Sequence, residues 1–178
     1  EDLINYAPKV PLAAGTLSGI VALAKLTKAI AIGELIQAYE RVPITVTTSL
    51  TPSFVDRATA LNYVLGLLNQ AQSEISATPP SADFNSNILG IGFNLQNTIG
   101  AMLARYSLIN GDYDNALLAA NSVNLTSTSS MFYTSTTARN PIYLITILQV
   151  YYRPVRSWRL NAESGDGRLA YWVTAGTQ

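Results

Sequence analysis

The chain has 178 residues, of which 48% are hydrophobic and only 12% are charged, and its formal net charge is zero. A neutral chain lacks the basic surface that neutralises phosphates, which argues against nucleic acid as a partner. It contains neither cysteine nor histidine, so disulfides, thiolate zinc sites and the usual general base of hydrolases are all excluded. We therefore expect one non-catalytic domain over residues 1–178, with no metal or cofactor.

The first predicted helix runs from Thr16 to about Arg41, just before a proline that ends it. Its apolar residues share a face and spill around the sides: Leu17, Ile20, Val21, Ala24, Ala31, Leu35 and Tyr39. Such a wide apolar surface predicts neighbours on more than one side. Lys25, Lys28 and Glu34 lie inside this helix, and each would cost about 2.5–3.5 kcal/mol near a bilayer centre. The sequence therefore predicts a buried core helix and not a membrane span.

A second helix is predicted after an extended connection over residues 44–50. It starts at Thr51-Pro52-Ser53, where proline suits the first turn and Asp56 is placed for a capping-box contact with Ser53. Its apolar residues follow in steps of three and four: Phe54, Ala58, Leu61, Val64, Leu65, Leu68, Ala71 and Ile75. The segment Thr78-Pro79-Pro80-Ser81 then breaks the chain.

Two more helices are predicted around a glycine turn. Asn94 can cap the first, which continues to Ile109, and Asp112 can cap the second, which runs to about Val123. Asp112 and Asp114 could also form a carboxylate pair for catalysis. A cap followed by a first-turn charge explains both positions better, because both are favoured at helix N-termini.

The segment Ala104–Ala120 (ARYSLINGDYDNALLAA) is the most informative part of the chain. One helix ends at Asn110-Gly111 and the next begins at once, with Ala104 and Ala116 where the two helices must touch. This spacing is typical of a tetratricopeptide-type hairpin, a class that binds and scaffolds. We predict a mainly α fold with about four main helices over residues 16–123, followed by an irregular, partly extended segment over 124–178. Two hairpins leave apolar ends uncovered, since stacked repeats need about three units.

Two glycine motifs imitate catalytic signatures. Ile88–Phe93 begins like a dinucleotide fingerprint, but Leu95 stands in place of the third glycine and no βαβ unit surrounds it. Gly15–Gly19 resembles a nucleophile elbow, but its serine is one place off and no histidine can activate it. We expect a flexible loop at Ile88–Phe93.

The C-terminal part is rich in aromatic and basic residues. The segment 142–152 could be a strand or a buried helical turn, and periodicity does not decide between them. Aromatic rings stack on sugars and arginine forks reach hydroxyls or carboxylates, so a glycan platform is one interpretation. The other is that these rings cover the helical core, the commoner role of aromatic side chains. The candidate ligand-binding residues are Trp158, Tyr171, Trp172, Arg156 and, in a Ser/Thr-rich loop over 126–137, Tyr133.

Five segments, taken together and in order, resemble the SusD/RagB family. They are Tyr39-x-x-Val42-Pro43-Ile44, the helix Tyr63–Ile75, the hairpin Ala104–Ala120, the turn Asn140-Pro141-Ile142-Tyr143, and Asp166-Gly167-Arg168 with Tyr171-Trp172. Members of that family are surface lipoproteins of Bacteroidetes-like bacteria that capture glycans or peptides and form a lid on a TonB-dependent outer-membrane transporter. The resemblance implies a tetratricopeptide-like helical scaffold with its ligand site in loops. It also implies an extracellular location at the outer membrane.

The chain departs from that family in its short length and in lacking a lipidated N-terminal cysteine. We expect either an excised segment or a reduced relative. The family's ligand residues do not map onto positions here. The leading hypothesis is a non-catalytic module that captures glycan or another nutrient beside a transporter. The alternative is a self-assembling surface protein, a filament or array subunit, because exposed helical ends and a weakly charged surface favour association between copies.

Overall fold

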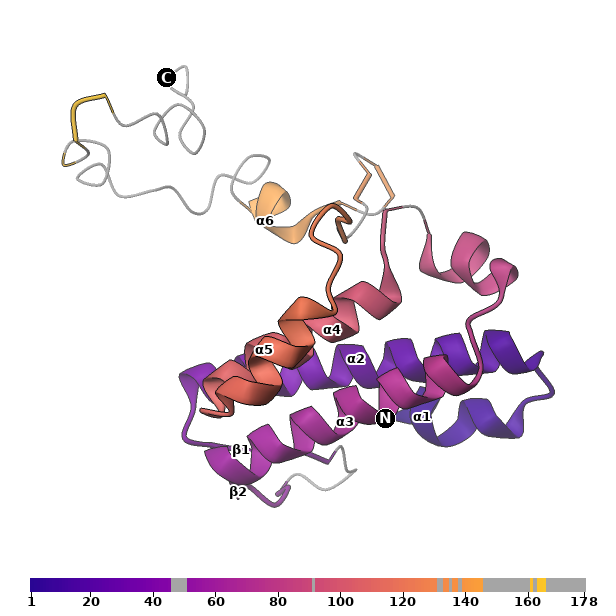
Figure 1. Cartoon of the computed structure of the whole chain (residues 1–178), viewed down its shortest axis with the longest axis horizontal. Helices are drawn as coiled ribbons and strands as arrows, with labels where there is room; N and C mark the ends of the chain where they lie inside the picture. The colour runs from indigo at the N-terminus through magenta and orange to yellow at the C-terminus, as the bar shows by residue number, and fades with distance from the viewer. Residues whose placement is uncertain are drawn as a thin grey trace. The chain divides into compact units, whose positions relative to one another are not determined.

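A computed structural model describes residues 1–45, 51–90, 92–130, 133–134, 136–137, 139–145, 161 and 163–165. The chain divides into two compact units, Glu1–Phe132 and Tyr133–Gln178. The first unit holds four main helices packed as two hairpins, with a two-stranded sheet beside them (Figure 1). The predicted mainly α fold is therefore confirmed.

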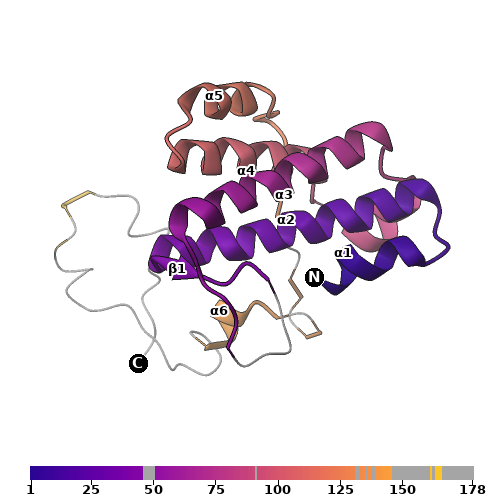
Figure 2. The same cartoon turned by 90° about the horizontal axis from the view of Figure 1, so that it is seen from below.

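The first hairpin pairs α2 (Ala14–Ala38) with α3 (Arg57–Ala77). Two short helices precede it, α1 (Asp2–Tyr6) and η1 (Ala7–Lys9). The second hairpin pairs α4 (Leu95–Ile109) with α5 (Tyr113–Asn121). In Figure 2 the four main helices follow one another in chain order, so that α3 lies between α2 and α4, and α5 covers the far side of α4.

The link between α2 and α3 differs from the prediction. Strands β1 (Arg41–Val42) and β2 (Val55–Asp56) pair antiparallel between the two helices, so that α2 ends at Ala38 and α3 begins only at Arg57. Asp56 is itself the cap of α3, since its Oδ1 accepts a hydrogen bond from the Thr59 backbone N–H at 2.7 Å. The predicted capping box with Ser53 is therefore wrong, although most of the predicted apolar face of α3 is buried as expected.

The buried face of α2 is also not the predicted one. Of the predicted set only Val21 is fully buried, whereas Leu35 and Tyr39 are 40% and 61% exposed. The buried positions instead include small residues, among them Gly19, Ala22, Ala29 and Gly33. Because α2 is apolar on every side, hydrophobic periodicity alone does not select its core face.

The charged residues inside α2 are held by partners in the first unit. Lys25 is buried and forms an ion pair with Glu74 of α3. Lys28 pairs with Glu1 and donates to the Tyr63 hydroxyl at 2.7 Å. Among the described residues, no helix is long and apolar enough to cross a membrane. This agrees with the interpretation of α2 as a core helix.

The second hairpin matches its prediction closely. Asn94 accepts a hydrogen bond from the Asn97 N–H at 2.9 Å, which caps α4. Gly111 has φ +77°, a left-handed conformation that side-chain-bearing residues rarely adopt, and this reverses the chain between α4 and α5. Ala116 is buried and Ala104 half-buried on the two helices.

Large rings dock onto the small residues of α2. A Cβ at Gly19 would lie 2.6 Å from the ring of Phe84, which is fully buried. A Cβ at Gly33 would overlap the ring of Tyr106, also fully buried and belonging to α4. Because these two glycines have no side chain, the rings of Phe84 and Tyr106 can pack directly against the backbone of α2.

Tyr106 gives the protein a pH-dependent stability. Its buried hydroxyl has no hydrogen-bond partner among the described residues. Burial, helped by the negative charge of Glu34 and opposed by Arg105, raises the pKa of this hydroxyl above its ordinary value of about 10. A raised folded-state pKa means that stability is complete below about pH 10 and falls at higher pH, where the unfolded chain ionises first.

Tyr106→Phe is expected to raise the free energy of unfolding by about 1 kcal/mol at pH 7, because it removes an unsatisfied polar group. The advantage should widen above about pH 10, since the variant no longer loses this stability. Urea unfolding of both proteins at the two pH values measures it. An advantage that is equal at both values would contradict the assignment.

The second unit contains one short described helix, α6 (Pro141–Tyr143). Its cap is Asn140, whose Oδ1 accepts from the Ile142 N–H at 2.8 Å and the Tyr143 N–H at 3.3 Å. The segment left open between strand and helix is therefore helical at its start, and residues 146–152 lie outside the described part.

Candidate functional site

The predicted ligand residues fall mostly where the structure gives no description. Trp158, Tyr171, Trp172 and Arg156 lie outside the described residues. Tyr133 is described, belongs to the second unit and is 47% exposed. The predicted platform of aromatic and arginine side chains therefore stays a prediction.

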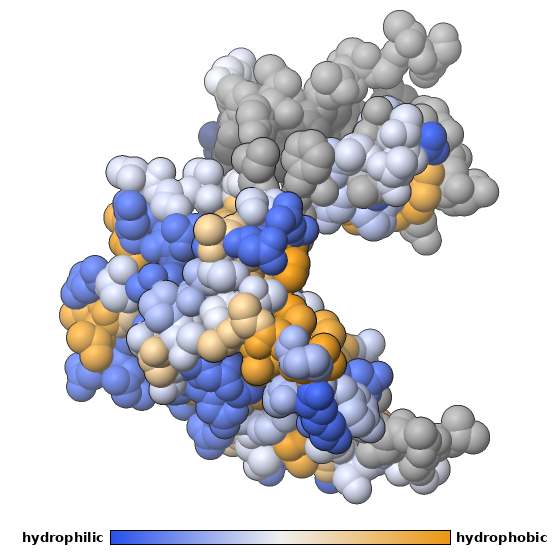
Figure 3. Space-filling model, turned by 90° about the vertical axis from the view of Figure 1, so that its right-hand side faces the viewer, coloured by the Kyte–Doolittle hydropathy of each residue, from blue (hydrophilic) through white to orange (hydrophobic). Residues whose placement is uncertain are grey.

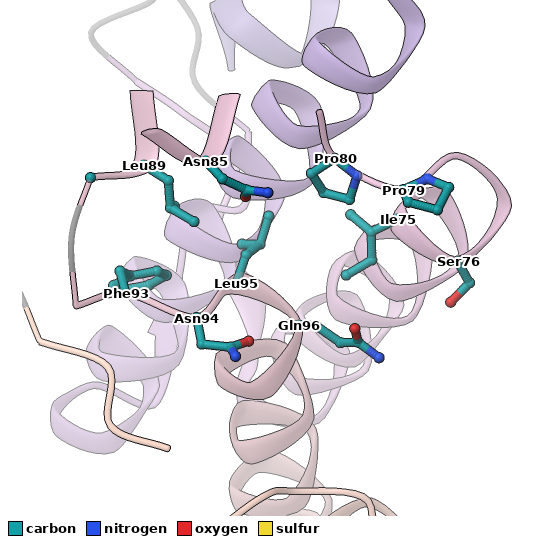
Figure 4. A pocket seen from close by; sticks show the side chains of 11 residues that line it. Ile75, Ser76, Pro79, Pro80, Asn85, Leu89, Phe93, Asn94, Leu95 and Gln96 are labelled. Atoms are coloured by element: carbon teal, nitrogen blue, oxygen red, sulfur yellow. The ribbon is translucent and has the colours of Figure 1, made fainter. Parts of the chain in front are cut away.

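A cavity of about 580 Å³ opens elsewhere, within the first unit (Figure 4). Three segments line it: the end of α3 with the prolines after it, the turn η2 (Phe84–Leu89), and the start of α4. The lining residues are Ile75, Ser76, Pro79, Pro80, Asn85, Leu89, Gly90, Phe93, Asn94, Leu95 and Gln96, none of which is charged. We call this cavity the η2–α4 pocket.

The wall formed by η2 overlaps the loop expected at Ile88–Phe93 only at Ile88 and Leu89, and the described residues Gly90, Gly92 and Phe93 are not helical. Residues Phe84–Leu89 form a π-helical turn, a conformation that occurs often at functional sites. Phe84 anchors the turn, because its ring is buried against Gly19 and its N–H donates to Ser81 Oγ at 3.1 Å. Gly90 and Gly92, with φ +82° and +87°, follow in the connection from η2 to α4. The two glycines of the incomplete nucleotide motif thus lie in the connection that follows η2.

The proline wall is fixed to the start of α2. The Ser81 N–H donates to the Gly15 carbonyl at 3.2 Å, and the Ser81 and Thr16 hydroxyls bond at 2.8 Å. These hydrogen bonds fix the path of the chain from Pro79 and Pro80 into η2. This side of the pocket therefore takes its shape from contacts within the protein.

The α4 wall is held by the segment that follows α5. The Asn94 N–H donates to Ser129 Oγ at 3.0 Å, and the Ser130 N–H donates to the Gly92 carbonyl at 2.9 Å. Asn97 and Asn124 exchange two further bonds, at 2.9 and 2.8 Å. Part of the Ser/Thr-rich segment that we expected to be a loop thus braces the start of α4.

The polar side chains that line the pocket are the amides of Asn85, Asn94 and Gln96 and the hydroxyl of Ser76. Asn85 and Gln96 are exposed to solvent, and their side chains make no hydrogen bond to any described residue, so both can donate and accept. The Phe93 ring and Pro80 supply apolar surface beside them. A cavity of this size, lined by both apolar and polar side chains, has room for a small molecule.

Asp112 caps α5, as the sequence predicts. Asp112 accepts from the Asn115 backbone N–H at 3.2 Å and from the Asn115 side-chain amide at 2.6 Å, so both of its oxygens are engaged. In the described part of the chain, no group of three or more Asp or Glu residues is placed to hold a metal ion.

Asp112→Ala is expected to lower the free energy of unfolding by about 1 kcal/mol through loss of the cap. Thermal or urea unfolding measures it, and Asp114→Ala, two residues later in the first turn and without a cap bond, is the matched control. Equal effects of the two variants would show that helix-dipole charge alone, and not the cap, is responsible.

No model of a protein family matches the chain, and neither a curated protein nor a solved structure does. The resemblance to the SusD/RagB family therefore rests on the five sequence segments, and the η2–α4 pocket rests on the geometry of this chain.

Proposed function

We propose that the protein is a non-catalytic, extracellular binding module of the SusD type that captures a glycan or another nutrient at the outer membrane, with a TonB-dependent transporter as partner. The observation that carries the capture function is the η2–α4 pocket, with its uncharged lining and two unpaired amides. The transporter and the location follow from the sequence resemblance alone.

Binding fits the pocket better than catalysis does. General acid–base chemistry requires a titratable side chain within hydrogen-bond reach of the substrate. None of the residues that line the pocket carries one, whereas amides and apolar rings hold a ligand without reacting with it.

The proposal is tested by titrating the protein with glycans and short peptides and by co-purification with candidate transporters. Saturable binding of either ligand class without turnover is the expected result. A protein that binds no member of either class at millimolar concentration would overturn it.

A second function is favoured by the exposed face of α5. Tyr113, Leu117 and Leu118 are 69%, 62% and 71% exposed there, and the face in Figure 3 also shows apolar patches of the first unit between polar ones. Apolar residues gathered at the end of a helical stack are typical of association surfaces. In this alternative the protein is a self-assembling surface subunit. Light scattering decides it, because a monomer at high concentration contradicts assembly.

A further inference from the structure

We infer that the η2–α4 pocket binds one uncharged sugar ring, with Asn85 and Gln96 as hydrogen-bonding residues and Phe93 as the stacking residue. This inference rests on the proposed capture function and assigns it a ligand class and a site within the first unit, formed by other residues than the aromatic ones predicted in the C-terminal part.

The lining argues for an uncharged ligand. A carboxylate or ammonium entering the pocket would lose hydration without meeting an opposite charge, which is costly. The start of α4 would otherwise attract an anion, but Asn94 already accepts from the Asn97 N–H there. A neutral ligand avoids both problems.

The positions of the amides argue for hydroxyl groups. Asn85 comes from η2 and Gln96 from the first turn of α4, on two different walls of the cavity (Figure 4). Each amide donates and accepts at once, which matches the hydroxyls of a sugar, themselves donors and acceptors. Phe93 lies in the connection that precedes α4, on the other side of the view in Figure 4 from Gln96, and its ring provides a face for sugar C–H groups.

The shape favours a sugar over a peptide. An extended peptide gains most when its main chain adds to a sheet edge or lies in a long groove. The only sheet in the described residues, β1 with β2, contributes no residue to this pocket. A cavity of about 580 Å³ that is open to solvent and lined by side-chain amides instead has room for a ring-shaped ligand.

Both walls are held in place before a ligand arrives. Phe84 fixes η2 to α2, and Ser129 and Ser130 fix the approach to α4. Binding therefore orders few groups, which reduces its entropic cost.

The test is a calorimetric titration of the whole chain with three probes: neutral oligosaccharides, oligosaccharides of matched length that contain uronic acid, and short uncharged peptides. It is repeated on Asn85→Ala and Gln96→Ala. The matched controls are Asn87→Ala, from the same turn but outside the pocket lining, and Gln70→Ala, exposed on α3. Asn85→Asp keeps the side-chain shape while removing the donor, and circular dichroism confirms folding of each variant.

We expect neutral oligosaccharides to bind more tightly than the other probes, and each pocket variant to raise their Kd about five- to tenfold, the loss of one hydrogen bond. The controls should stay within about twofold. Neutral-sugar binding that is unchanged in all the pocket variants would overturn the site while leaving the capture function intact. Preferential binding of uronic-acid probes or peptides would overturn the ligand class. Binding of no probe at all would overturn the capture function and the inference together.

Discussion

Replacing Gly33 by alanine is expected to lower the free energy of unfolding by about 1–3 kcal/mol, although alanine is the better helix former. Gly33 is buried in α2, and a Cβ there would overlap the Tyr106 ring. Tyr106 is fully buried, so its ring has no free space to move into, and the helices must separate or strain. Urea unfolding at neutral pH measures the loss.

Gly66→Ala is the matched control for this prediction. Gly66 also lies inside a helix, α3, but a Cβ there would meet nothing within 4 Å. This variant should stabilise the protein by about 0.5–1 kcal/mol, since only the backbone preference changes. If Gly33→Ala also stabilised the protein, this would contradict the close contact between α2 and the Tyr106 ring of α4.

A second variant separates crowding at Gly33 from a general loss of helix packing. Tyr106→Leu removes the ring that the new methyl group would strike. Alone, it should destabilise the protein by creating a cavity. Combined with Gly33→Ala, it should cost less than the sum of the two single changes, because residues in contact are not additive.

The parts of the fold that the sequence predicted correctly depend on neighbouring residues. Caps such as Asn94 and Asp112 act on N–H groups three residues away, and Gly111 sets its own φ. Short-range signals of this kind are visible in a single chain. The second hairpin was therefore predicted with its start and turn almost in place.

The parts that were wrong depend on distant residues. Nothing near Gly19 in the sequence indicates that Phe84 docks there, and the core face predicted for α2 therefore differs from the one that is buried. The strand at Val55 exists only because Val42 pairs with it, and this pairing delays the start of α3. In both cases a tertiary contact overrides a local preference.

The candidate site was missed for a related reason. Its lining comes from three separate segments, and its polar groups are ordinary amides such as Asn85 and Gln96, which carry no motif. The sequence did draw attention to Ile88–Phe93, but for a nucleotide signature that it does not complete. The useful signal there was the pair Gly90 and Gly92, which both have positive φ in the connection between two walls of the pocket.

Phe84→Ala is expected to cost the most, about 3–5 kcal/mol, because it empties a fully buried aromatic site. The loss should be centred on η2, which this ring fastens to Gly19 of α2. Amide hydrogen exchange should therefore rise first at Asn85, whose N–H donates to the Ser81 carbonyl at 3.1 Å. Exchange in the α4–α5 hairpin should rise only with global unfolding.

Phe54→Ala tests whether the loss of stability in Phe84→Ala comes from the buried position of that ring at η2 or would follow the removal of any phenylalanine. Phe54 is 50% exposed, so this variant should change stability by much less than Phe84→Ala. Phe84→Leu keeps an apolar anchor and should fall between the two. Since η2 carries Asn85 into the pocket, Phe84→Leu should also weaken binding of neutral sugars at a temperature where the protein stays folded. Stability that falls while exchange at Asn85 is unchanged would mean that η2 is positioned by other contacts, and that the pocket does not depend on the docking of Phe84 against α2.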